Sequence, residues 1–226
     1  MAAIEAILFD AYGTLFDLRS AVTPHTAKLG DRADRLAALW RQKQLEYTWT
    51  ASLRGAYRDF EAITQDALAF ALAAEKISDP GLAAGLLQSF HALAPYPDAE
   101  ATLRALKARN LRLGILSNGT PEMLSQLIAS QPFAALLQPV VSVDAVKVFK
   151  PDARVYRLGV ETLGIAPGRI GFVSGNAWDA GGAAAFGFQV FWINRAGQPA
   201  EYDLAGRATV LSALGELPSV LEQKTS

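Results

Sequence analysis

A short apolar run near the start of the chain ends in an aspartate. Residues 6–9 are all apolar, Asp10 follows directly, and Gly13-Thr14 supplies the residue types of a turn. A run of this length bounded by turn residues is typical of a buried strand, which would carry the carboxylate at its carboxyl end. Open α/β sheets place their chemistry at these ends. The segment therefore predicts a fold class and a candidate reactive group together.

The remaining residues divide into a helical block and an alternating block. Residues 17–97 hold no convincing strand, and their apolar residues recur at helical spacing. After residue 97, helical and strand patterns alternate, which predicts a parallel, doubly wound α/β sheet. The expected helices are 31–47, 59–74, 82–93, 99–108, 152–163 and 179–185, and the expected strands are 111–116, 139–143, 170–173 and 189–193.

Two prolines mark expected helix boundaries. Pro80, followed by glycine, predicts a break before the helix over 82–93, whereas Thr120 and Pro121 predict the N-cap and first residue of another helix. The last residues, 223–226, are expected to be frayed.

Composition limits the kinds of partner that the chain binds. Its 226 residues are 51% apolar and carry a net charge of −1, with acids and bases interspersed. No basic stripe predicts nucleic-acid binding, no apolar run is long enough for a membrane span, and no signal peptide is visible. Cysteine is absent and only His25 and His91 occur. We therefore expect a cytoplasmic protein whose acid–base chemistry uses carboxylates, lysine or hydroxyls.

Four polar segments are expected at the carboxyl ends of different strands. They are Asp10–Thr14, Ser117–Thr120, Lys150-Pro151 and Ser174–Asp179. Such strand ends meet in one crevice of a doubly wound sheet. Singly, each segment has an ordinary explanation as a helix cap, a turn or a solvated loop. Together, in this order and spacing, they form a specific combination.

These segments resemble the haloacid dehalogenase superfamily, and within it the L-2-haloacid dehalogenases. The resemblance rests on FDAYGTLFD (residues 9–17), LSNGT (116–120), VKVFKPDARVY (146–156) and SGNAWDAGGAAAFGF (174–188). It implies a Rossmann-like core over residues 1–16 and 98–226, with an inserted helical cap over 17–97. It also implies a homodimer that hydrolyses a small-molecule 2-haloacid with inversion at C2 and releases a halide ion.

Tyr12 separates this chain from phosphatases of the same superfamily. Those enzymes bind Mg²⁺ and use a second aspartate, two residues after the nucleophile, to protonate the leaving alkoxide. A phenol serves poorly as that acid near neutral pH, and Ser174 stands where another acid is often found. A halide ion leaves without a proton and needs only cations or donors aimed at it. Because Lys150 and an arginine can balance Asp10 and Asp179, neither a metal nor another cofactor is expected.

The resemblance further implies a two-step reaction on short (S)-2-haloalkanoic acids. The Asp10 carboxylate displaces the halide from C2 and forms an ester, which water then hydrolyses to an (R)-2-hydroxy acid. The resemblance implies that Thr14 and Lys150 support Asp10, that Ser117 binds the substrate carboxylate, and that Arg41 and Asn118 receive the halide. It implies that Asn176 and Asp179 orient or activate water, and that Tyr156 and Ser174 support the charged groups. The apolar pocket that it implies is formed by Tyr12, Leu45, Phe60 and Trp178.

Some of these assignments stay open in the sequence. The helical insertion carries several arginines, so spacing alone does not select the one that binds halide. They are Arg32, Arg35, Arg41, Arg54 and Arg58. Aromatic residues at helical positions are also more often packing than specificity determinants. Two other functions remain as alternatives, namely a magnesium-dependent phosphatase and a scaffold that binds a metabolite or partner without turnover.

Overall fold

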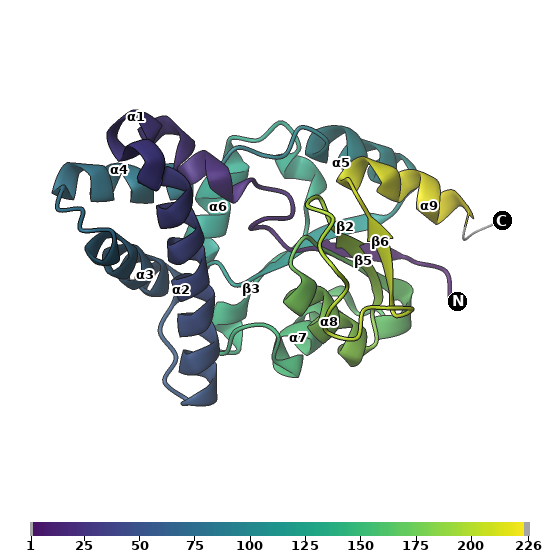
Figure 1. Ribbon diagram of the computed structural model, residues 1–226. Coiled ribbons are helices and arrows are strands. Elements are labelled where there is room, and N and C mark those ends of the chain that lie inside the picture. The colour runs from purple at the N-terminus through teal and green to yellow at the C-terminus, as the bar shows by residue number, and fades with distance from the viewer. Residues whose placement is uncertain (1, 224–226) are drawn as a thin grey trace.

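The computed structural model describes residues 2–223, which contain a six-stranded parallel sheet (Figure 1). The strand order is β3-β2-β1-β4-β5-β6. The chain builds outward from β1 to β3, returns to place β4 beside β1, and then builds outward in the other direction. The switch point of the sheet therefore lies between β1 and β4. The bounds are β1 Ala6–Phe9, β2 Arg112–Ser117, β3 Val140–Ser142, β4 Ile170–Ser174, β5 Gln189–Ile193 and β6 Ala208–Leu211.

Helices cover both faces of this sheet, which confirms the doubly wound α/β fold. Figure 1 shows α5 and α9 above the sheet and α7 and α8 below it. The bounds are α5 Ala99–Ala108, α6 Pro121–Ala129, α7 Ala153–Leu163, α8 Ala177–Phe186 and α9 Leu217–Gln223. Since β1 is covered on both faces, all four of its residues are buried and apolar. No helix within residues 2–223 has the length and apolarity needed to cross a membrane.

A helical cap is inserted between β1 and α5 and stands beside the sheet (Figure 1). It contains α1 Thr26–Leu29, α2 Ala33–Leu53, α3 Phe60–Ala74 and α4 Pro80–His91. The chain leaves and re-enters the core at adjacent points, because the Tyr96 N–H donates to the Leu15 carbonyl at 2.9 Å. The inserted cap is thus confirmed as part of the fold, while the domain boundaries after residues 16 and 97 stay a prediction.

Side-chain caps explain where two of the helices begin. The Asp79 carboxylate accepts a hydrogen bond from the Leu82 N–H at 2.9 Å, and Pro80 takes the first position of α4. Proline fits that position because its missing N–H would have no helical partner there, so the helix begins at Pro80, two residues before the expected start at residue 82. The N-cap predicted at Thr120 is confirmed, since its hydroxyl accepts from the Met123 N–H at 3.1 Å.

Other element ends also differ from the sequence-based expectation. Helix α2 continues to Leu53 instead of ending at residue 47, and α8 begins at Ala177 instead of residue 179. The pattern missed β6 and α9. Strand β6 lies at the edge of the sheet and buries only Leu211, so its apolar alternation is weak. Gln223, expected to be frayed, ends α9, and residues 224–226 of that prediction lie outside the described residues.

Candidate active site

Asp10 is the first residue after β1 and lies at the switch point of the sheet. Its N–H donates to the carbonyl of Val173 in β4 at 2.9 Å, so this residue joins the carboxyl ends of the two central strands. Asp10 is only 6% exposed. A carboxylate with so little access to water depends on donors of the protein to stabilise its charge.

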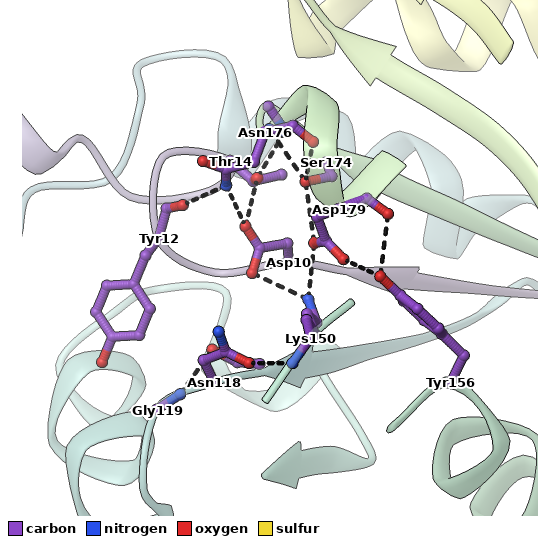
Figure 2. Close-up of polar contacts among 12 residues, drawn as sticks. Asp10, Tyr12, Thr14, Asn118, Gly119, Lys150, Tyr156, Ser174, Asn176 and Asp179 are labelled. Atoms are coloured by element: carbon purple, nitrogen blue, oxygen red, sulfur yellow. Dashed lines mark hydrogen bonds and ion pairs between the residues drawn. The ribbon is translucent and has the colours of Figure 1, made fainter. Parts of the chain in front are cut away.

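Three side chains donate hydrogen bonds to the Asp10 carboxylate (Figure 2). Thr14 Oγ1 and Asn176 Nδ2 donate to Oδ2 at 3.0 and 2.8 Å, and Lys150 Nζ donates to Oδ1 at 3.2 Å. The Thr14 hydroxyl accepts in turn from the Gly175 N–H at 2.8 Å, which directs its own proton toward Asp10. A Cβ on Gly175 would lie 2.2 Å from a backbone oxygen of the turn after β1, so glycine is required for this approach.

Lys150 is a buried cation between two carboxylates. Its Nζ lies 3.2 Å from Asp10 Oδ1 and 2.9 Å from Asp179 Oδ2, and the residue is 1% exposed. Burial alone would lower the pKa of the ammonium, but the two carboxylates outweigh burial and raise that pKa. The ammonium bridges Asp10 Oδ1 and Asp179 Oδ2, so a divalent ion could not bridge these same two oxygens. Within residues 2–223, no group of three or more acidic, histidine or cysteine side chains could hold a metal.

Asp179 is fully buried and belongs to the same network (Figure 2). Its Oδ2 accepts from Lys150 Nζ and from Ser174 Oγ at 3.1 Å, and its Oδ1 accepts from the Tyr156 hydroxyl at 2.8 Å. Burial raises the pKa of Asp179 to about 6 against the opposing effect of the Lys150 charge. Asp179 is the third residue of α8, and its carboxylate faces this network, so its alternative explanation as only a helix cap was wrong.

Asn176 links the nucleophile candidate to the helical cap. It holds the N-cap position of α8, yet its side chain makes no capping hydrogen bond. Its Nδ2 donates to Asp10 and, at 3.0 Å, to the carbonyl of Tyr12, while its Oδ1 accepts from Arg41 Nη2 at 3.1 Å. The Asn176 side chain thus binds these three groups instead of capping α8, which indicates that it belongs to the site.

Arg41 is therefore distinguished from the other arginines of the insertion by its bond to Asn176. Arg35 and Arg58 instead form surface ion pairs, with Glu75 and Asp66 respectively. Burial lowers the pKa of Arg41, and the nearby carboxylates of the site oppose that shift. The cluster thus balances the charges of two carboxylates, on Asp10 and Asp179, with those of two cations.

Gln44 and Thr64 hold the Arg41 guanidinium, although neither residue was selected from the sequence. Arg41 Nη1 donates to Gln44 Oε1 at 2.7 Å, and Gln44 Nε2 donates to Thr64 Oγ1 at 2.7 Å. Both partners are buried. Gln44 lies on the buried stripe of α2, one turn from Trp40 and one from Thr48. A glutamine in such a stripe indicates a specific hydrogen bond, and that signal was available in the sequence.

The loop after β2 lies next to this cluster. Asn118 Oδ1 accepts from the Lys150 backbone N–H at 3.0 Å, and Ser117 Oγ accepts from the Gly119 N–H at 3.2 Å. Ser117 is fully buried at the end of β2. The Asn118 Nδ2 donates to no acceptor among residues 2–223 and is free for a ligand. Figure 2 shows Asn118 beside Lys150, on the same side as Tyr12 and below Asp10.

Tyr12 belongs to an aromatic group beside the cluster. Its ring stacks on Phe90 at 5.3 Å and packs against Phe60 at 5.4 Å between centroids. A Cβ on Gly119 would lie 2.9 Å from the Tyr12 ring, so the ring requires glycine at that position. Burial, followed by the charges of nearby carboxylates, raises the pKa of Tyr12 well above its usual range. The Tyr12 phenol therefore stays neutral. Its ring lines the site, and its hydroxyl is not suited to act as a general acid.

Two of the expected pocket residues are less closely connected to Asp10. Trp178 packs edge-on against Trp49 of α2 at 5.6 Å, so it joins the core to the helical cap. Leu45 is partly exposed and lies one turn after Arg41 on α2. The structure places Leu45 on the appropriate helix but records no packing of it against the hydrophobic core.

Comparison with known proteins covers nearly the whole chain. A family model described as haloacid dehalogenase-like hydrolase matches residues 4–187. The chain is 46% identical over 226 residues to (S)-2-haloacid dehalogenase 1 of Pseudomonas sp. (strain CBS-3), with all of both chains covered. It is 41% identical to (S)-2-haloacid dehalogenase 4A of Burkholderia cepacia, which covers 99% of this chain and 97% of the relative.

A solved structure gives the same agreement in three dimensions. The L-2-haloacid dehalogenase of Xanthobacter autotrophicus, with chloropropionic acid covalently bound, superimposes with a TM-score of 0.86 at 37% identity. The match covers 97% of this chain and 98% of that one.

Proposed function

The chain belongs to the haloacid dehalogenase-like hydrolase family, and we propose that it hydrolyses short (S)-2-haloalkanoic acids to (R)-2-hydroxy acids. The observation that carries this proposal is the Lys150 ammonium between Asp10 and Asp179. It places a positive charge beside the carboxylate of Asp10, which we assign as the nucleophile. Tyr12 stands where a phosphatase needs an acid, and its raised pKa removes that function.

In the first step, an Asp10 oxygen attacks C2 of the substrate from the side opposite the halogen. A carbon–oxygen bond forms, the carbon–halogen bond breaks, and the halide leaves with both electrons, so C2 is inverted. Oδ1 is the freer oxygen, since it accepts one hydrogen bond whereas Oδ2 accepts two. Arg41 and Asn118 receive the negative charge that develops on the halogen. Ser117 and the backbone amides after it bind the substrate carboxylate.

In the second step, water attacks the carbonyl carbon of the Asp10 ester. Asn176 and Asp179 orient or activate this water, while Ser174 and Tyr156 hold Asp179 in place. Thr14, Asn176 and Lys150 donate to the oxygens that become negative. The acyl carbon–oxygen bond then breaks, Asp10 is restored, and the 2-hydroxy acid carries away an oxygen that began on Asp10. One proton is released to solvent for each halide formed.

The apolar part of the substrate lies against Tyr12, Leu45, Phe60 and Trp178. Such walls limit water around the reacting carbon and strengthen the charge interactions at the halogen. Because Trp178 meets Trp49 of the cap, the pocket is completed by both parts of the fold. The active chain is a homodimer by analogy with its family, and size-exclusion chromatography with light scattering measures that state.

A single-turnover reaction in oxygen-18 water tests the ester. With enzyme in excess over (S)-2-chloropropionate, the label is expected in Asp10 after one turnover and in the hydroxy acid only after later ones. Label in the first product would mean direct attack of water on C2 and would overturn the mechanism. The same reaction is run with EDTA and with the (R)-enantiomer, which are expected to leave halide release unchanged and to abolish it, respectively. Phosphate release that needs Mg²⁺, without halide release, would favour a phosphatase.

A further inference from the structure

A cavity of about 410 Å³ lies between the segment after the first turn and the helical cap. One side is formed by residues 18–26 and the other by α2, and Phe90 of α4 contributes to the wall. Much of the lining is small, including Ala33, Ala37 and Ala38. The volume falls in the range of small-molecule sites, which begins at about 300 Å³, and no role assigned above uses this space.

The cavity touches the catalytic cluster at two places. Arg41 lines the cavity and also donates to Asn176, which donates to Asp10. Leu18 lines the cavity as well, and its Cδ1 would lie 3.5 Å from a Cβ on Gly13, in the turn that follows Asp10. Arg41 and Asn176 therefore connect the cavity to the nucleophile, with two side chains between the cavity and the Asp10 carboxylate.

The charges along this cavity favour an anion. Arg41 lines it and contacts Asn176 of the core, while its Nε–H donates to no acceptor within residues 2–223. Arg19 lines the outer part and pairs with Asp34 at 3.0 Å, where the two side chains are 77% and 87% exposed. An ion pair with this exposure is weak, so Arg19 can turn toward a passing anion at little cost. No other acidic residue lines the cavity.

We propose that this cavity is the exit path of the halide ion, an inference that rests on the proposed function. The halide is received by Arg41 on the Asp10 side and passes the guanidinium into the cavity, where Arg19 meets it near the surface. Gln44 holds the guanidinium in the wall between the two spaces. Separate departure matters chemically, because a halide that stays beside the ester can attack C2, break the new carbon–oxygen bond and re-form the substrate.

Narrowing the cavity tests this path. Ala38 is exposed and lies three residues before Arg41, so Ala38→Phe fills the space with little risk to folding. Ala37→Phe, at a partly buried position one turn before Arg41, is the second variant. Ala51→Phe is the matched control. Ala51 lines a different groove on the same helix and lies ten residues from Arg41, which corresponds to about 15 Å.

Two signals are followed during one turnover of chloroacetate, bromoacetate and iodoacetate. Rapid quenching and mass spectrometry measure the Asp10 ester, and a halide-sensitive dye in stopped flow measures the free ion. In both cavity variants, we expect the free halide to lag behind the ester, most for iodide and least for chloride. About tenfold slower iodide release is expected, equal to ~1.4 kcal/mol in the barrier. Ala51→Phe is expected to behave as the unaltered chain does.

The outcomes separate this inference from the proposed function. Failure of the unaltered chain to form ester or release halide removes the proposed function and the exit path together. Normal ester formation and halide release in both cavity variants removes the exit path alone. Slower ester formation in the cavity variants, with the free halide appearing together with the ester, would make the cavity the route of substrate access and would equally overturn the proposal.

Discussion

Replacement of Lys150 by methionine tests whether one buried ammonium supports the whole site. Methionine keeps much of the side-chain length and removes the charge that lies 3.2 Å from Asp10 and 2.9 Å from Asp179. With an effective dielectric constant of about 20, each contact contributes roughly 5–6 kcal/mol of gross attraction, most of which offsets desolvation. Because two buried carboxylates lose their counterion, we expect a net loss of about 3–5 kcal/mol in the free energy of unfolding.

The loss is expected to depend on pH with a definite sign. Without the ammonium, the pKa of Asp179 rises further, since the Tyr156 hydrogen bond remains but the Lys150 charge no longer opposes the effects of burial and of the Asp10 charge. The folded variant then binds more protons than its unfolded chain, so its stability falls as pH rises through that pKa. The deficit should therefore be larger at pH 8 than at pH 5.

Urea unfolding followed by circular dichroism measures these differences at both pH values. Lys147→Met is the control, because Lys147 is 63% exposed and lies 3.7 Å from Asp144, so a change within about 1 kcal/mol is expected. Lys150→Arg keeps the charge and should recover most of the stability. In Lys150→Met, the rate of halide release should fall by roughly 10²–10³-fold relative to the unaltered chain, which is the scale found for removing one preorganised donor. A loss below about 1 kcal/mol, or one that is equal at the two pH values, would refute the reasoning.

Two further predictions follow from the same network. Because the pKa of Asp179 is raised to about 6, ester hydrolysis should slow as pH falls through 6 and the carboxylate becomes protonated, and Asp179→Asn should remove this limb from the single-turnover pH profile. Thr64→Val removes the acceptor of the Gln44 amide, so it should cost about 1–3 kcal/mol of stability and loosen Arg41. Its rate loss should be larger for chloroacetate than for iodoacetate, since the poorer leaving group needs the cation more, and an equal loss for both would mean that Thr64 has only a structural role.

The core of the fold could be predicted because its signals are local. Each strand at the centre of the sheet is a short apolar run, and β1 is buried along its full length. Helix α5 has the bounds 99–108 expected from its sequence. The pattern failed where burial is partial, as in edge strand β6, or where a cap decides the boundary, as with Asp79 before α4. The break between α3 and α4 was expected, but the Asp79 cap places Pro80 inside the helix as its first residue.

The site followed from the sequence to the extent that topology brings its parts together. The parallel sheet aligns strand ends, so Asp10, Ser117 and Ser174 converge whatever the cap does. Arg41 could not be selected in this way, because its bond to Asn176 joins residues 135 positions apart across the two parts of the fold. The spacing of apolar residues along the sequence predicts helices and strands, but it does not predict how the helical insertion packs against the sheet. Here the resemblance to a family supplied a choice that helical spacing left open.

Gln44 is a different case, because its place among the apolar residues of one helix face is visible in the sequence, yet it was not among the predicted site residues. A buried glutamine needs partners for its oxygen and its amide, and the structure supplies Arg41 on one side and Thr64 on the other. These two hydrogen bonds explain how a helix of the cap can position the Arg41 guanidinium accurately relative to Asp10, which is held by the sheet. Asp10 is fixed by local turn geometry, whereas Arg41, the halide acceptor that we propose, is fixed by the buried polar residues Gln44 and Thr64 of the helical insertion. Differences in leaving group should therefore be most sensitive to changes in the cap, and differences in ester hydrolysis to changes in the sheet.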